Sequence, residues 1–318
     1  MTKDELISAV NFLFEEEKQK QIVFYCIDSS KKVKMLNINS VLLSELLKDF
    51  TESIRERIVE EVYDIQEYTA ADRRKGSYYR YDLPEEPAEF SFFTEVLGQN
   101  IPMFNFDDGW INQIKKLVIV ISSGDQRVIL YKDISGVEKY LKQGKYFMLM
   151  KCEDRFDKIP EDILGVNNKF QMMKVGNDIL ILNMESIEKN FSLNQVIRNE
   201  AERGKERVQS LISDMAIINQ MCDDDSSFQK KIIATKHSFV YTLKDGNGNR
   251  IIIDAIILDY IRNNPDICGT FSFDDNGKVV INNKSKAKRF VKVLNEDYLK
   301  SGLTNIIYDA FDKKRAEG

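Results

Sequence analysis

The sequence predicts an α+β protein in which helices and short antiparallel hairpins interleave. Segments with apolar residues at helical spacing alternate with pairs of short apolar segments joined by turn residues. The regular strand–helix–strand rhythm of a Rossmann fold and the glycine-rich loop of a P-loop protein are both missing from the sequence. The length of 318 residues suggests two regions. We place an α+β region of unknown role at 1–112 and a second α+β domain at 113–318.

The N-terminal region begins with an expected amphipathic helix over 2–19, which starts at a capping box formed by Thr2 and Glu5. A strand over 22–28 follows, with 31–38 as its hairpin partner. Leucine, isoleucine and phenylalanine at helical spacing then predict a long helix over 40–65. The polar and aromatic segment 66–87 is interpreted as a loop or an exposed hairpin.

The second region starts with two strands over 117–133 that flank a Ser-Ser-Gly-Asp turn. Ser135 and Glu138 are expected to cap a short helix that ends at Gly144. A hairpin over 169–183 with a Gly-Asn turn follows. The remaining expected elements are helices from 192 to 237 with an acidic break at 223–225, a helix over 251–264, a hairpin over 271–281 that turns at Asn276-Gly277, and a helix over 285–300.

The cysteine pattern favours a cytoplasmic protein without a metal site or cofactor. The cysteines are far apart and form no CxxC pair, and a single histidine leaves no Cys/His zinc set. The N-terminal segment lacks the basic start and apolar stretch of a signal peptide, and no apolar run is long enough to span a bilayer. The four expected free thiols are Cys26, Cys152, Cys222 and Cys268.

A lysine stripe on the last expected helix is the first candidate for DNA binding. Lys284, Lys288 and Lys292 are spaced by four residues, and Lys286 and Arg289 flank them. From Asn283 to the end the chain carries 9 basic and 5 acidic residues, despite the net charge of −5. A local basic patch attracts phosphates over a Debye length of about 10 Å, so the acidic whole does not exclude DNA. The alternative is a solvated lysine-rich face.

A second candidate lies in the segment 71–83, where basic residues interleave with tyrosines. Basic side chains bind phosphates, while aromatic faces can stack on exposed bases. The alternative is an exposed hairpin whose tyrosines pack on the domain. The basic residues of this patch are Arg73, Arg74, Lys75 and Arg80, and the aromatic residues are Tyr78, Tyr79 and Tyr81.

No catalytic residue is expected. His237 stands alone at a predicted helix end, and nucleophile elbow, Walker loop and dinucleotide fingerprint are all missing from the sequence. A Mg²⁺-dependent nuclease remains an alternative, and it would need carboxylates that converge near a lysine. The acid-x-Lys spacings at Glu16 and Asp312 do not resemble a nuclease strand, and the acidic runs 223–225 and 274–275 are typical of turns. The charges of 198–207 alternate in sign, which predicts mutual neutralisation.

Three segments resemble the KwaB-like family of bacterial defence loci over about 130–314. They are YKDI at 131–134, ILILNMESIEKNFSLNQVI at 179–197 and RFVKVLNEDYLKSGLTNIIYDAFDKK at 289–314. The resemblance implies a non-catalytic anti-phage defence subunit that binds DNA, forms a homodimer and acts with KwaA, a membrane protein that would recruit it to the inner face of the membrane. The alternatives are the nuclease effector and a protein–protein interaction module that does not bind nucleic acid.

Overall fold

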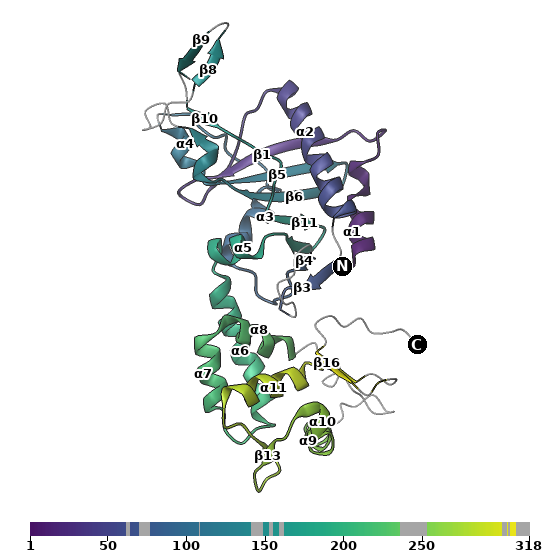
Figure 1. The fold of residues 1–318 in the computed structure, drawn as a ribbon. Coiled ribbons are helices and arrows are strands. Elements are labelled where there is room, and N and C mark those ends of the chain that lie inside the picture. The colour runs from purple at the N-terminus through teal and green to yellow at the C-terminus, as the bar shows by residue number, and fades with distance from the viewer. Residues whose placement is uncertain are drawn as a thin grey trace. The chain divides into compact units, whose positions relative to one another are not determined.

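The chain forms two compact units in a computed structural model, which describes residues 1–61, 64–69, 77–107, 109–140, 149–152, 155–158, 162–235, 253–300, 304 and 306–309. The sheet unit comprises Met1–Gln66, Lys75–Tyr81 and Pro87–Phe191, and the helical unit comprises Glu67–Arg74, Asp82–Glu86 and Ser192–Gly318. The predicted α+β class is confirmed, with no Rossmann or P-loop arrangement in the described part (Figure 1). The regions expected at 1–112 and 113–318 do not coincide with these units, because strands from both sides of residue 112 share one sheet.

The sheet unit is built on eight strands in the order β2-β1-β5-β6-β11-β12-β4-β3. The three central strands, β1, β5 and β6, pair antiparallel along their full length, and residues 117–121 of β5 are all buried. Strands with no exposed face need cover on both sides of the sheet. The strands are β1 (Gln21–Ile27), β2 (Val33–Met35), β3 (Asp64–Glu67), β4 (Ser77–Arg80), β5 (Lys116–Ser123), β6 (Gln126–Asp133), β11 (Met172–Val175) and β12 (Asp178–Ile181).

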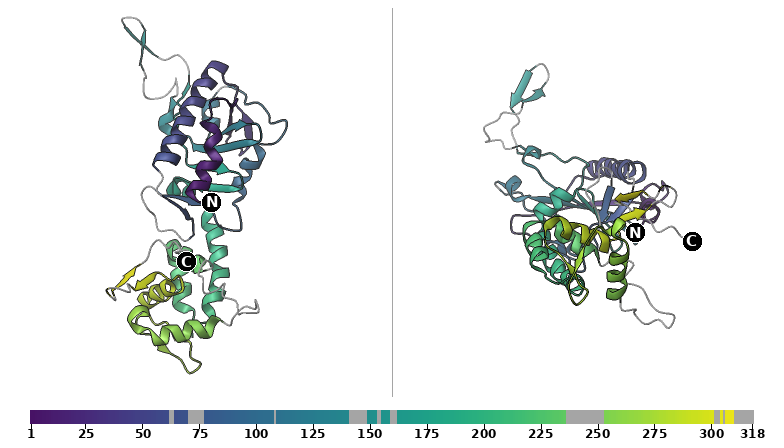
Figure 2. Two further views of the ribbon diagram at one scale, coloured as in Figure 1. Left: turned by 90° about the vertical axis from the view of Figure 1, so that its right-hand side faces the viewer. Right: turned by 60° about the horizontal axis from the view of Figure 1, so that its bottom comes forward.

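Helices cover one face of this sheet. α1 (Lys3–Val10) and α2 (Ser40–Ile54), the latter continued by the π-helical segment η2 (Arg55–Glu60), pack there (Figure 2). Leu6, Phe50 and Ile54 are fully buried against Phe24 and Leu130 of the strands. The predicted capping box at Thr2 is confirmed. The first helix is shorter than the predicted 2–19, since beyond the short 3-10 turn η1 (Asn11–Leu13) the polar segment 15–20 offers no apolar side chain to bury.

Aromatic side chains cover the opposite face. The rings of Phe92 and Phe191 pack on Tyr131 of β6, with centroids 5.3 and 5.2 Å from that of Tyr131, and Phe90 packs on both phenylalanines. Such edge-to-face and offset ring contacts add stability beyond the buried area. The supporting elements are η3 (Ala88–Ser91), α3 (Phe92–Glu95) and α5 (Met184–Asn190). Around them lie α4 (Trp110–Gln113), η4 (Gly136–Glu138), β7 (Lys139–Tyr140), β8 (Leu149–Cys152), β9 (Arg155–Lys158) and β10 (Ile163–Leu164).

The helical unit packs five longer helices around an apolar core. Buried side chains of α6, α8 and α11, among them Val208, Ile232 and Phe290, meet in this core. The predicted acidic break is confirmed, since Asp225 ends α7 and caps α8 by accepting a hydrogen bond from Ser227 N at 2.9 Å. The elements are α6 (Leu193–Gln209), α7 (Ala216–Asp224), α8 (Ser226–Ala234), α9 (Ile253–Asn263), α10 (Pro265–Cys268), β13 (Ser272–Phe273), β14 (Val279–Val280), α11 (Lys284–Leu294), β15 (Tyr298–Lys300) and β16 (Ile307–Asp309).

The last helix was predicted too long. α11 ends at Leu294, with Asn295 as its C-cap, and Glu296 takes the left-handed backbone conformation (φ 58°) that turns the chain away. Tyr298 therefore lies in β15 and not on the helix. Among the described helices of both units, none combines the length and the apolar character that a membrane crossing requires.

Candidate nucleic-acid interface

The helix α11 separates an apolar face from a basic one, as its sequence predicts. Asn283 caps the helix by accepting a hydrogen bond from Lys286 N at 2.9 Å. Ala287, Phe290 and Leu294 are buried in the core of the helical unit. Because these side chains fix the rotation of the helix, the basic residues between them are held on its remaining surface.

Lys284 has an acidic neighbour on another helix. Its ammonium group lies 3.2 Å from Asp224 Oδ2 at the end of α7, and both side chains are more than half exposed. An exposed ion pair of this kind contributes about 0–1 kcal/mol, so water and salt compete with it readily. A DNA phosphate would likewise compete readily with Asp224 for the ammonium group of Lys284.

Arg289 has partners inside the protein. Its Nε donates to the carbonyl oxygen of Cys268 at 2.7 Å, and its Nη2 donates to that of Ile267 at 3.0 Å. The guanidinium thereby binds the free carbonyls at the end of α10 and lies 5.2 Å from the ring centroid of Tyr298. These contacts give Arg289 a structural role that joins α10, α11 and β15.

Lys292 is half-buried beside the same tyrosine. Its ammonium lies 5.7 Å from the ring centroid of Tyr298. This geometry is within the range of a cation–π contact, which stabilises the ammonium where it stands. Lys292 therefore belongs, like Arg289, to the end of the helix that packs against β15.

Lys286 and Lys288 are the basic residues of α11 that keep their charge available. Lys288 is exposed, Lys286 is half-buried, and neither forms an ion pair or side-chain hydrogen bond with another described residue. Lys286 lies in the first turn, where the positive end of the helix dipole disfavours cations by about 0.3–1 kcal/mol, and Lys288 lies at the start of the second turn. An anion bound near the helix N-terminus would offset that cost, and Lys286 and Lys288 would approach it from the two sides of the exposed face, since residues two apart on a helix point in different directions.

The second candidate patch has one basic residue in the described part of the chain. Arg73, Arg74 and Lys75 lie outside the described residues, and Arg80 pairs with Asp178 at 3.4 Å on the neighbouring strand β12. The tyrosines of β4 pack into the sheet unit, since Tyr78 and Tyr79 are 8% and 4% exposed, and Tyr81 contacts the ring of Phe90. Buried rings present no face to a base, and this favours the packed-hairpin interpretation of these tyrosines.

The mixed charges of α6 neutralise one another, as predicted. Arg203 contacts Glu200 at 2.5 Å and Glu85 at 2.8 Å, and Lys205 contacts Glu202 at 2.6 Å. The acidic partners hold the pKa of Arg203 above its ordinary value, with the hydrogen bond to Glu85 as the main cause. Arg203 and Lys205 of α6 are therefore neutralised within the protein.

One residue of each acidic run accepts hydrogen bonds from the backbone. Asp225 caps α8, and Asp274 Oδ1 accepts hydrogen bonds from Asn276 N at 3.0 Å and Lys278 N at 2.8 Å in the hairpin turn. Within the ranges that the structure describes, no group of three metal-ligating side chains converges. His237 and Asp312 lie outside those ranges.

Sequence reasoning missed the partners that decide which lysines are available. Asp224 is separated from Lys284 by sixty residues. The carbonyl oxygens that hold Arg289 carry no side-chain signal at all. The position of Tyr298 depends on where the helix ends, and Glu296 gave no indication of a left-handed stop.

Comparisons with known proteins place this fold in a family. The family model described as Kiwa protein KwaB-like matches residues 111–304, which is more than half of the chain. Kiwa protein KwaB of Escherichia coli O55:H7 (strain RM12579 / EPEC) is 24% identical over 329 aligned residues, which cover 100% of both chains. No solved structure matches the chain. The family match shows that the chain belongs to the KwaB-like family of Kiwa anti-phage defence proteins.

Proposed function

We propose that this chain is a non-catalytic, DNA-binding subunit of anti-phage defence that contacts the phosphate backbone through the N-terminal half of α11. The observation that carries the proposal is the pair Lys286 and Lys288, whose ammonium groups have no acidic partner among the described residues. Lys284 adds a third cation that is held only by an exposed ion pair. The resemblance to the KwaB-like family supports two further expectations, a homodimer and a KwaA-like membrane protein that recruits it.

The physical basis is release of counterions from DNA. Each phosphate that a lysine neutralises releases condensed cations, and this term acts on any sequence. The contacts proposed for the helix are lysine ammonium groups and N-terminal backbone groups that bind phosphates, and phosphate contacts carry no direct sequence information. Binding is therefore expected to be independent of sequence and to weaken steeply with salt.

Charge reversal of the two unpaired lysines tests the proposal. A Lys286→Glu/Lys288→Glu variant should shift duplex DNA in a gel far less than the unaltered chain, because two attractive contacts become repulsive. The matched control is Lys48→Glu/Lys189→Glu, which changes charge equally at exposed positions of the sheet unit. Equal retardation by all three proteins would show that α11 does not contact DNA.

The non-catalytic part of the proposal has a separate test. The purified chain is incubated with plasmid and Mg²⁺, with a chelator as control, at concentrations that retard DNA. We expect intact plasmid, because the acidic residues of the described turns serve the backbone. Metal-dependent cleavage that persists through further purification would establish the nuclease effector instead.

A second candidate function, an interaction module that does not bind nucleic acid, is favoured by an apolar groove of about 330 Å³ on the sheet unit. Its lining includes Leu42, Phe106 and Val166, which are 46%, 53% and 37% exposed. Large exposed apolar side chains that gather in one place are typical of protein contacts. In this candidate function the groove holds a second copy of the chain, in agreement with the expected homodimer.

DNA retardation separates the two candidates, and light scattering tests the groove as the contact between copies. A Phe106→Asp variant should be monomeric if the groove is the dimer contact, while its DNA retardation decides whether nucleic-acid binding needs the dimer. Co-purification with a KwaA-like protein after nuclease treatment tests the membrane partner independently. A variant that remains dimeric would exclude the groove as the contact between copies.

A further inference from the structure

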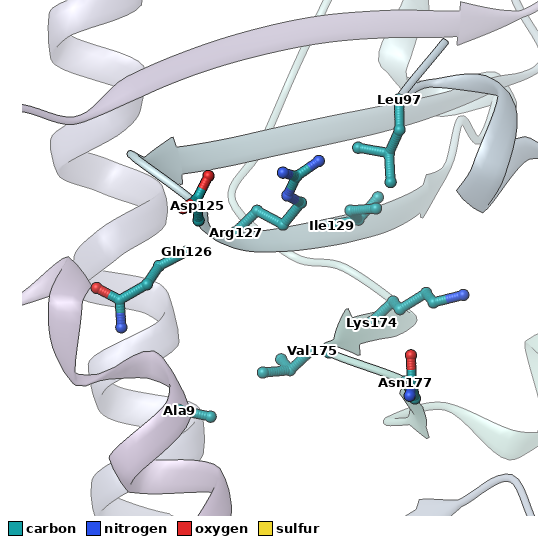
Figure 3. A pocket seen from close by; sticks show the side chains of 10 residues that line it. Ala9, Leu97, Asp125, Gln126, Arg127, Ile129, Lys174, Val175 and Asn177 are labelled. Atoms are coloured by element: carbon teal, nitrogen blue, oxygen red, sulfur yellow. The ribbon is translucent and has the colours of Figure 1, made fainter.

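A cavity of about 400 Å³ lies at one end of the sheet unit, far in sequence from the lysines of α11 (Figure 3). The start of β6 and the turn between β11 and β12 supply most of its lining, which includes Arg127, Lys174, Ile129 and Asp125. Leu97, 42% exposed, contributes an apolar wall beside these charged side chains. The volume is within the range of about 300–1,000 Å³ that is typical of small-molecule sites.

Strand register places the two cations on one face of the sheet. Ile129 of β6 pairs with Lys174 of β11, and Arg127 lies two residues before Ile129, so its side chain points to the same side. Arg127 and Lys174 are therefore diagonal neighbours, whose Cα atoms are separated by about 7–8 Å in such a sheet. Figure 3 shows Ile129 between them, with Leu97 on the adjoining segment.

The charges of this cavity are not balanced. Arg127 is exposed and forms no ion pair or side-chain hydrogen bond with any residue in the described ranges, and Lys174 lies 5.5 Å from the ring centroid of Phe93 without an acidic partner in those ranges. Asp125 is the acidic residue of the lining. Arg127 and Lys174 together outweigh this single carboxylate, so the lining carries a net positive charge that a bound anion would offset.

We propose that this cavity binds a small phosphorylated molecule of nucleotide size. The phosphate groups lie between Arg127, whose planar guanidinium matches phosphate oxygens, and the Lys174 ammonium. The apolar part of the ligand packs against Leu97 and Ile129. This site belongs to the sheet unit, so it is independent of the DNA contact proposed for α11.

Calorimetric titration of the full chain with ATP and with inorganic pyrophosphate tests the site. Both ligands should bind saturably, and ATP should bind more tightly because it adds a base that covers the apolar wall. Arg127→Gln and Lys174→Gln should each weaken binding about tenfold or more, since each removes a charge-assisted contact. The control Lys189→Gln removes the same charge from an exposed position of α5 and should leave binding unchanged.

A second variant keeps the test independent of charge. Leu97→Trp fills the cavity and retains both cations, so it should abolish ATP binding, and circular dichroism should show that each variant stays folded. Absence of binding by both ligands would overturn the proposal. The proposed site would also be refuted if Lys189→Gln weakened ATP binding as much as the cavity variants do, or if the cavity variants bound ATP like the unaltered chain. DNA retardation by α11 is measured alongside and separates failure of this site from failure of the proposed function.

Discussion

Neutralising Lys286 and Lys288 should change the salt dependence of DNA binding by a predictable amount. The structure leaves three lysines of α11 for phosphate contact, the two unpaired ones and Lys284, because Arg289 and Lys292 have partners in the protein. At about 0.9 per phosphate, three contacts give a log–log slope of about −2.7 against salt for duplex DNA. The Lys286→Gln/Lys288→Gln variant keeps one contact, so its slope should become shallower, at about −0.9.

Fluorescence anisotropy of a labelled duplex across a salt series measures these slopes. The control Lys48→Gln/Lys189→Gln removes two exposed charges elsewhere and should keep the slope of the unaltered chain. Asp224→Asn frees Lys284 from its ion pair and should tighten binding slightly. An unchanged slope in the Lys286→Gln/Lys288→Gln variant would refute the assignment, because it would mean that those two ammonium groups contact no phosphate.

Three further predictions concern stability and follow from single contacts. Burial alone would raise the pKa of Asp28, but hydrogen bonds from Ser30, Lys34 and Lys32 hold it well below its ordinary value. The ionised carboxylate therefore stabilises the fold above pH ~4, and this contribution to stability is lost as the pH falls further. The melting temperatures of the unaltered chain and of Asp28→Asn should consequently differ at pH 7 and converge in acid. Asp225→Ala removes the cap of α8 and should cost about 1 kcal/mol in urea unfolding, whereas no change would disprove the capping role. Gly269→Ala should lower the free energy of unfolding by about 1–3 kcal/mol in the same assay, because Gly269 has a φ of +84° and an added Cβ would lie 2.5 Å from Arg289 Nε. An unchanged free energy of unfolding would show that this close approach is not required.

The sequence predicted those parts of the fold that depend on short-range signals. The hairpins over 117–133 and 169–183 are confirmed, because each turn carries a glycine with positive φ between two apolar strands. Helix ends were less predictable. The predicted helix over 40–65 continues as a π-helical segment only to Glu60, and the strand β3 begins at Asp64. Where a helix stops depends on what its last turn can pack against, and that information lies elsewhere in the chain.

In the candidate interface, too, the features that depend on neighbouring residues were predictable and those that depend on distant segments were not. The helical spacing of Ala287, Phe290 and Leu294 is a local signal, and these side chains form the buried face of α11. The state of each ammonium group was not predictable, because Asp224 and the carbonyl of Cys268 approach from distant segments. Tyr78 and Tyr79 show that a local pattern can also suggest a site that the fold does not form. They lie near basic residues in the sequence, but they belong to a strand and their rings are buried in the sheet unit.

The basic residues of α11 divide along the helix axis, and this division predicts how a polyanion approaches. Arg289 is the middle residue of the helix and Lys292 lies in its last turn, and the end of α10 and Tyr298 of β15 occupy their polar groups. Lys286 and Lys288 precede them, next to the capped N-terminus. A polyanion at that end meets the positive end of the helix dipole and has Lys286 and Lys288 on the two sides of the exposed face, whereas at the other end it would have to displace protein contacts and face the negative end. Substitution of Arg289 should therefore lower stability with little effect on the salt slope, and substitution of Lys288 should do the reverse.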